Sequence, residues 1–140
     1  MNDRKWAANM ISVEGIREPL TKTILLVEDE APVRRLLRDS LACKYEVLES
    51  CDGVEAVTVF EKNLSRILVV ITDLEMPRLN GDVLAEWIHG IRPELPVILI
   101  SARKREDDLI SALLASKRVE FLGKPFDLWQ LEELVERAVA

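Results

Sequence analysis

The sequence has few residues suited to covalent cross-links or soft-metal sites. Its 140 residues include two cysteines and one histidine. Cys43 and Cys51 lack the CxxC spacing of zinc and redox motifs, and no cluster of histidines completes a ligand set. We expect both cysteines to be small apolar residues in a reducing compartment, without a disulfide. These absences argue against zinc-dependent, thiol-redox and disulfide-scaffold proteins.

Positive charge and long apolar runs are also scarce. Asp and Glu outnumber Lys and Arg by 25 to 19, which gives a formal net charge of -6. Such a surface repels phosphate backbones, so we expect no direct nucleic-acid binding. No apolar stretch approaches about 18 residues and no secretory signal is present, so we predict a cytoplasmic protein that does not contact a membrane.

What remains is the composition of one globular domain. Hydrophobic residues make up 49% of the chain and charged residues 31%, which is typical of a protein with a packed core. The first twenty residues show a brief helical pattern that Gly15 and Pro19 interrupt. We therefore interpret residues 1–20 as a tail or linker and residues 21–140 as a single domain.

Short apolar runs alternate with helical patterns from residue 21 onward. The runs of strand length are residues 24–27, 45–48, 67–71, 97–100 and 119–122. Helix starts are expected after each run, with Pro32 in the first turn of the first helix and Asp52 and Asp127 as caps of the second and last. This alternation predicts an α/β fold with a doubly wound, five-stranded parallel sheet covered on both faces.

Helical spacing also predicts which side chains face the core. The expected apolar stripes include Leu36, Val54, Leu64, Val83 and Ile91. In the third helix, Trp87 and His89 are interpreted as a packing residue and a surface residue. Trp129 lies beside the stripe of the last helix, so both a packing role and a partner or dimer face stay open.

Polar side chains follow four of the predicted strands at the point where each strand ends. They are Glu28, Asp29 and Glu30 after the first, Asp73 after the third, Ser101 after the fourth, and Lys124 and Pro125 after the fifth. In such sheets, ligands bind outside the carboxyl ends of the strands. If the first and third strands are neighbours, two carboxylates at about 4 Å repel by roughly 4 kcal/mol at an effective dielectric constant of 20. The cluster therefore requires a cation.

The residue types at this end of the sheet favour phosphoryl transfer. Oxygen ligands without Cys or His favour Mg²⁺, or Mn²⁺, and a carboxylate beside a metal, a lysine and a hydroxyl can attack phosphorus to form an aspartyl phosphate. Taken singly, Glu30 is simply a helix cap, Lys124 a surface lysine and Ser101 a turn cap. Their joint occurrence favours the chemical interpretation.

Four stretches of the chain carry a family resemblance. LLVEDE, ITDLEMPRLNG, ILISA and FLGKPF occur in this order, and together they resemble the receiver domain of two-component response regulators, as in chemotaxis receivers, from about Thr23 to Val139. The resemblance implies a flavodoxin-like fold with strand order 2-1-3-4-5. Other parts of the sequence look like receivers of hybrid histidine kinases, so a free-standing regulator and the receiver of such a kinase both stay open.

The resemblance implies a role for each matching residue. It implies that Asp73 is the phosphoacceptor. The implied ligands of Mg²⁺ or Mn²⁺ are Glu28, Asp29, Asp73 and the main-chain carbonyl of Glu75. Ser101 and Lys124 are implied to bind the phosphoryl group, Phe121 and Ser101 to be the switch residues, and Lys124 and Pro125 to be joined by a cis peptide bond. Glu28 departs from the commoner Asp and Ser101 from the frequent Thr, and residues 103–118 match the family least well.

The resemblance also implies partners. They are a sensor histidine kinase or a histidine phosphotransfer protein, and a downstream partner on the face of the fourth helix, fifth strand and fifth helix; a homodimer stays open. Such a domain is no enzyme in the usual sense, although it assists its own phosphorylation and dephosphorylation. Three other functions fit the sequence less well. A dehalogenase-type phosphatase would have Asp at the position of Glu75, and a flavodoxin-like cofactor site would not have the acidic turn EDEAP. A phosphorylation-independent docking module would lack some of the residues needed for phosphorylation.

Overall fold

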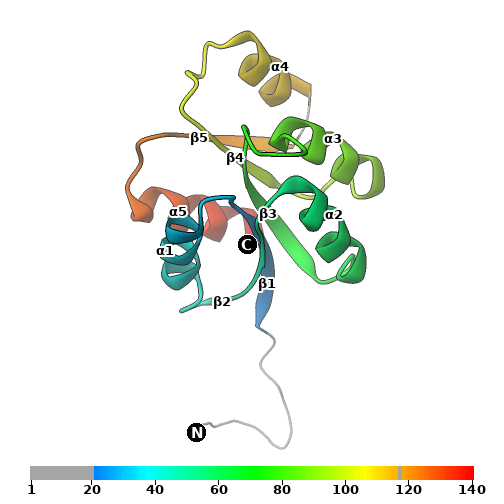
Figure 1. Ribbon diagram of the computed structural model, residues 1–140, viewed down its shortest axis with the longest axis vertical. Helices are drawn as coiled ribbons and strands as arrows, with labels where there is room; N and C mark the ends of the chain where they lie inside the picture. Colours follow the sequence, from blue (N-terminus) through cyan, green and yellow to red (C-terminus); the bar gives the residue numbers. More distant parts are fainter. Residues whose placement is uncertain (1–20, 117) are drawn as a thin grey trace, which may run out of the picture.

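The computed structural model describes residues 21–116 and 118–140, so the predicted tail lies outside the described residues. Strands and helices alternate along the chain (Figure 1). The strands are β1 Lys22–Val27, β2 Tyr45–Ser50, β3 Ile67–Asp73, β4 Val97–Ser101 and β5 Val119–Gly123, and the helices are α1 Ala31–Leu41, α2 Gly53–Lys62, α3 Gly81–Ile91, α4 Asp108–Ser116 and α5 Leu128–Val139. No helix in this part of the chain is long and apolar enough to cross a bilayer.

The strands form one parallel sheet in the order β2-β1-β3-β4-β5, which confirms the predicted topology. The central strands read as unbroken apolar runs because both of their faces are covered. The first four observed strands include polar residues beyond the predicted runs, such as Asp73 at the end of β3 and Ser101 at the end of β4. Ladder hydrogen bonds therefore continue up to the residues of the site.

Helices cover the sheet in two layers (Figure 1). On one face, α1 and α5 pack on alternate strand residues such as Ile24 and Ile71. On the other, α2, α3 and α4 pack on the intervening residues, such as Leu25 and Val70. Because successive side chains of a strand point to opposite faces, the same strands supply both cores.

Several predicted core positions are wrong. Leu36, Val54, Leu64, Val83 and Ile91 are exposed, with exposed fractions of 39 to 56%. Successive residues of an α-helix are about 100° apart, so when Leu37 and Leu41 of α1 face the sheet, their neighbour Leu36 turns away from it. An apolar residue at the margin of a stripe is thus left in solvent.

Histidine and cysteine positions also differ from expectation. His89 was predicted to be a surface residue, but it is 7% exposed, and its Nε2 lies 2.8 Å from the carbonyl oxygen of Leu95. The last turn of α3 brings the ring over the chain that leads into β4, where it finds this acceptor. Cys43 and Cys51 are free, as expected, but both are exposed, because they lie in the connections that flank β2.

Candidate functional site

Strand register brings the predicted site residues together. In the β1–β3 ladder Val27 is opposite Thr72, so the next residues along each strand, Glu28 and Asp73, lie side by side at the carboxyl end of the sheet. In the β4–β5 ladder Ser101 is opposite Gly123, which places Lys124 at the same end. The topology therefore collects these groups before any side-chain contact is considered.

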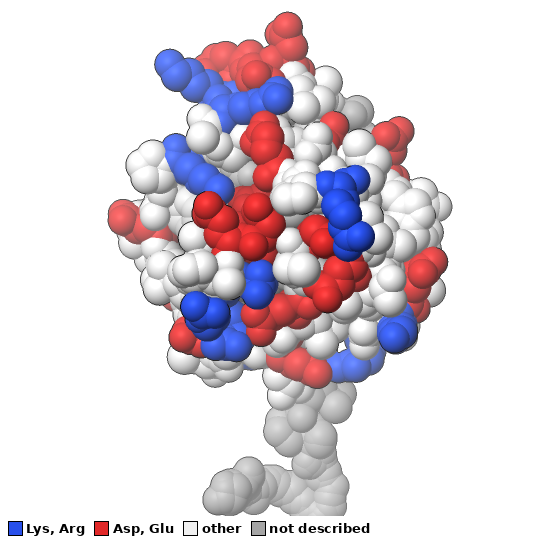
Figure 2. All heavy atoms as spheres, viewed as in Figure 1, with Lys and Arg blue, Asp and Glu red and all other residues white. Residues whose placement is uncertain are grey.

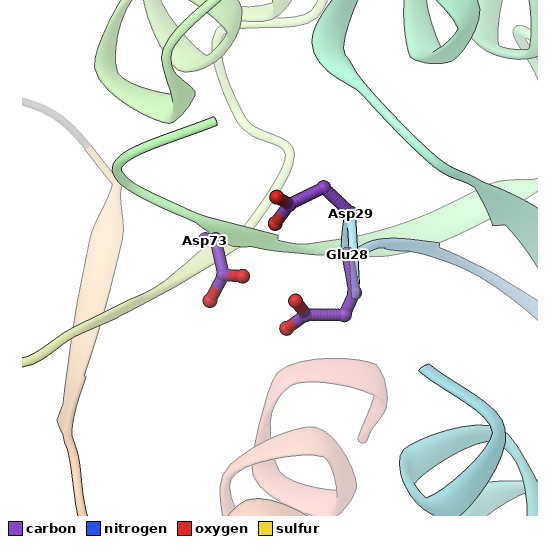
Figure 3. Close-up of side chains that lie close together, drawn as sticks. All are labelled: Glu28, Asp29 and Asp73. Carbon is purple, nitrogen blue, oxygen red and sulfur yellow. The ribbon is translucent and has the colours of Figure 1, made fainter. Parts of the chain in front are cut away.

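Three carboxylates converge at this end. Glu28, Asp29 and Asp73 each offer an oxygen, and the three oxygens lie within 4.8 Å of one another. Figure 3 shows the side chains extending from the ends of β1 and β3 toward a common space. Glu28 and Asp73 are 2% and 4% exposed, whereas Asp29 is open to solvent. The cluster is thus buried on one side and accessible on the other.

The cluster holds more negative charge than its neighbours neutralise. Burial and then the neighbouring Asp73 carboxylate raise the pKa of Glu28 to about 8, against the hydrogen bond that Glu28 accepts from the amide of Glu30. Lys124 Nζ lies 3.2 Å from Asp73 Oδ1 as an ion pair. Burial lowers the pKa of Lys124, but attraction to Asp73 and Glu28 outweighs this and leaves it raised. On the face shown in Figure 2, acidic side chains gather near the centre.

These donors fit a hard divalent cation. All are oxygens, and the buried Oδ1 of Asp73, although 3.2 Å from Lys124 Nζ, accepts no hydrogen bond of good geometry from the described residues. A buried carboxylate oxygen without such a bond is unusual in a folded protein, and a cation of the Mg²⁺ type satisfies it with few protein ligands. The carboxylates of Glu28, Asp29 and Asp73 are therefore suited to share one metal ion.

The turn after β1 is fixed by residues that the sequence did not indicate. Arg34 of α1 donates from Nη1 to the carbonyl oxygen of Glu28 at 2.8 Å, and its Nε lies 3.3 Å from Glu49 of β2. The amide of Glu28 donates to the carbonyl oxygen of Ser50 at 3.0 Å. No short motif predicts these contacts, because the Arg34 bond depends on the turn between β1 and α1, and the other two join β2 to segments that precede it in the chain. Glu30 occupies the N-cap position of α1, but its side chain makes no capping bond.

The β4 and β5 ends contribute Ser101 and Lys124. Ser101 is 2% exposed, its Oγ accepts from the amide of Arg103 at 3.0 Å, and its carbonyl oxygen accepts from the amide of Lys124 at 2.8 Å. The Lys124–Pro125 peptide bond is cis. The main-chain bond places Ser101 and Lys124 side by side at the carboxyl ends of β4 and β5, and the Lys124 amine reaches Asp73.

The side chains of Glu75 and Phe121 make their described contacts with residues outside the carboxylate cluster. The side chain of Glu75 turns outward and accepts from Arg103 Nε at 2.8 Å. The Phe121 ring lies beside Gly123, where an added Cβ would be 3.4 Å from ring atom Cε2. The guanidinium carbon of Arg105 lies over the Phe121 ring, 5.8 Å from the ring centroid. Both contacts involve arginines of the segment that resembles the family least.

The family is decided by comparison with known proteins. The model of the response regulator receiver domain matches residues 24–136. The chain belongs to this family. It is a receiver domain of two-component signal transduction, and the strand-end carboxylates described above lie within the matched region.

Individual relatives belong to two kinds of protein. The chain is 35% identical over 115 residues to the sensor kinase CckA of Brucella abortus, covering 81% of this chain and 12% of that protein. It is 36% identical over 115 residues to the response regulator MprA of Mycobacterium tuberculosis, covering 81% of this chain and 47% of that one. The chain thus spans less than half the length of either relative. The crystal structure of the receiver domain from the hybrid histidine kinase CckA superposes with a TM-score of 0.71 at 35% identity, covering 84% of this chain and 99% of that one.

Proposed function

We propose that Asp73 accepts a phosphoryl group from a phosphohistidine of a sensor histidine kinase or a histidine phosphotransfer protein. The observation that supports this most is the convergence of Glu28, Asp29 and Asp73 within 4.8 Å beside one lysine. In the transfer, an Asp73 carboxylate oxygen forms the new P–O bond while the P–N bond to the donor histidine breaks. The imidazole leaves with that electron pair. The products are an aspartyl phosphate and a free histidine.

The surrounding residues have distinct tasks in this proposal. Glu28, Asp29, Asp73 and the main-chain carbonyl of Glu75 hold Mg²⁺ or Mn²⁺, which when bound neutralises charge on the transferring phosphoryl group. The Lys124 amine, now 3.2 Å from Asp73 Oδ1, turns to a phosphoryl oxygen. The Ser101 hydroxyl donates to another. Since these groups act once per phosphoryl cycle on the protein itself, the domain is a signalling phosphoacceptor that assists its own phosphorylation and dephosphorylation.

Phosphorylation is proposed to change the surface formed by α4, β5 and α5. Ser101 moves toward the phosphoryl group, and Phe121 follows it from β5 toward β4. Coupling of this kind is typically about 1 to 3 kcal/mol, whereas moving a population from 1:99 to 99:1 takes about 5.5 kcal/mol. A bound partner therefore completes the switch. Trp129 of α5, 59% exposed, offers an apolar anchor for that partner or for a second copy of the domain.

The relatives leave two architectures for the proposal. One is a response regulator, as the name of MprA states, and the other is the receiver of a hybrid kinase, as for CckA. In both, the donor is a phosphohistidine and the acceptor site is the same. The chemistry of Asp73 can therefore be tested on the domain alone.

The test of the proposed function uses a small phosphodonor. Incubation of the domain with Mg²⁺ and acetyl phosphate is expected to add one phosphoryl group, seen as a mass increase in intact mass spectrometry and absent after chelation of the metal. The Asp73→Asn variant is expected to gain none. Asp39→Asn is the matched control, because Asp39 is an exposed residue of α1 whose side chain is 70% accessible. Phosphorylation of Asp73→Asn at the normal rate would refute the assignment.

A further inference from the structure

The turn that joins β3 to α3 is closed by short-range contacts. The amide of Gly81 donates to the carbonyl oxygen of Leu74 at 2.7 Å, and the amide of Met76 donates to Asn80 Oδ1 at 3.2 Å. Leu74 and Met76 are 2% and 7% exposed, so both side chains anchor the turn in the core. Glu75 lies between these anchors, and the direction of its carbonyl is set by the path of the turn.

Arg78 holds an unfavourable backbone conformation within this turn. Its φ is 72°, the one positive φ of a non-glycine residue among residues 21–116 and 118–140. For a residue with a Cβ, such a conformation costs about 1 to 3 kcal/mol and persists only where its surroundings hold it. Within the main chain, the amide of Leu79 donates to the carbonyl oxygen of Pro77 at 2.8 Å and closes a tight turn around Arg78. The side chain of Arg78 adds a contact outside the turn. Nε and Nη2 of Arg78 donate to Asp52 Oδ2 at 3.1 and 2.8 Å.

Asp52 links this turn to the start of α2. Its Oδ2 accepts from Arg78 while its Oδ1 accepts from the amide of Glu55 at 2.8 Å and so caps the helix. The two backbones also touch here, because a Cβ added to Gly53 would lie 2.5 Å from the carbonyl oxygen of Leu79. The turn is therefore seated on the first residues of α2 through an ion pair and a backbone contact.

We infer that Arg78 and Asp52 are positioning residues for the metal site. Their ion pair seats the β3–α3 turn on α2 and thereby orients the Glu75 carbonyl relative to Asp73. On its other side, Glu75 is tied through its carboxylate to Arg103 at 2.8 Å. The inference rests on the proposed function, since it assigns the Glu75 carbonyl to a divalent cation. It adds two residues that the acidic cluster does not contain.

The sign of the expected effect separates positioning from simple electrostatics. Removing Arg78 takes away a positive charge, so by Coulomb's law alone the acidic cluster should attract Mg²⁺ more strongly. Loss of positioning predicts the opposite, weaker binding. Arg66→Ala is the matched control, because Arg66 is also an arginine paired with an acid, Glu46, but it precedes β3 at the amino end of the sheet.

The experiment measures Mg²⁺ binding to the whole 140-residue chain by isothermal titration calorimetry. Arg78→Ala is expected to weaken binding about threefold to tenfold, below the roughly 10- to 100-fold typical of direct partners of metal ligands, because Arg78 acts through the turn. Arg78→Gly accepts a positive φ without strain, so it keeps the fold and is expected to weaken binding by a similar factor. Asp52→Asn keeps the helix cap and loses the charge that holds Arg78, so binding weakens again.

Thermal unfolding without metal provides the second readout. If Arg78→Gly lowers the melting temperature but binds Mg²⁺ as tightly as the unaltered protein, the pair is only structural and the inference is overturned. Tighter binding, or the same affinity as in Arg66→Ala, overturns it as well. If the unaltered protein neither binds Mg²⁺ nor gains a phosphoryl group, the proposed function fails and this inference fails with it. Weaker binding by Arg78→Gly beside normal binding by Arg66→Ala supports it.

Discussion

The two ends of the sheet differ in how fully their acidic residues are neutralised. At the amino end, each of two acids has an arginine of its own: Glu46 pairs with Arg66, and Glu94 with Arg92. At the carboxyl end, Asp52 and Glu75 also pair with arginines, Arg78 and Arg103. The three converging carboxylates differ, because the ion pair described for them is that of Asp73 with Lys124. The same apolar strands run from one end to the other, so the strands themselves do not cause this difference. Incomplete neutralisation therefore distinguishes the candidate site from these arginine-paired acids.

The pKa values of two acids, one from the amino end and one from the cluster, shift in opposite directions. The hydrogen bonds from Arg66 and Thr23 lower the pKa of Glu46, whereas burial and the neighbouring Asp73 raise the pKa of Glu28. A lowered pKa means that the fold stabilises the ionised carboxylate, and a raised pKa means that the fold destabilises it relative to the neutral acid. Acids that the fold itself stabilises need no ligand. Acids held together against their repulsion are suited to a cation.

The same glycine substitution at the two ends of α3 is expected to show the largest contrast. A Cβ on Gly81, where α3 begins, would lie 2.1 Å from the carbonyl oxygen of Asp73, so Gly81→Ala must displace the turn and should lower the free energy of unfolding by about 3 kcal/mol. A Cβ on Gly90, near the end of the helix, meets no atom within 4 Å, so Gly90→Ala should raise it by up to about 1 kcal/mol. Urea denaturation measures both. Equal effects of the two changes would contradict the close approach.

Added Mg²⁺ should stabilise the domain through the carboxyl end alone. At a concentration of 100 times the dissociation constant, a ligand of the native state adds about 2.7 kcal/mol. We expect a higher melting temperature in a thermal shift assay, reversed by EDTA. Asp29→Asn should lose most of this shift because one of the three converging carboxylates is gone. Glu46→Gln, the matched loss of an acid at the amino end, should keep it, and a reduced shift in Glu46→Gln would contradict the division between the two ends.

Sequence patterns predicted the parts of the fold that depend on repeating apolar residues. The five strands and their order were predicted, and the carboxylates Glu28 and Asp73 came together because parallel strands bring their ends to one place. That reasoning needs only the alternation of strands and helices and the family resemblance. It does not tell which of two neighbouring helix residues at the edge of an apolar stripe faces the core, and Leu36 and Val54 were assigned wrongly for this reason.

The contacts that fix the site were beyond the sequence. The bonds from Arg34 to the Glu28 carbonyl and from Arg78 to Asp52 join segments whose distance depends on the folded turns. The positive φ of Arg78 has no signature either, since a turn of this kind more often has Gly or Asn at such a position. His89 was misplaced for a related reason, because its acceptor, the Leu95 carbonyl, lies in the next connection of the chain.

The smallest expected effect tests the amino end of the sheet. Because Arg66 lowers the pKa of Glu46 below its ordinary value of 4.5, the folded state gains stability from this acid above that pH and loses the gain as the pH falls through the lowered pKa. The pair is exposed, so Glu46→Gln should reduce the free energy of unfolding at pH 7 by only about 0.2 to 1 kcal/mol. In a urea denaturation series, the difference from the unaltered protein should shrink as the pH falls below 4.5 and vanish below the lowered pKa. A difference that stays constant down to pH 3 would mean that the contact acts through packing and not through charge.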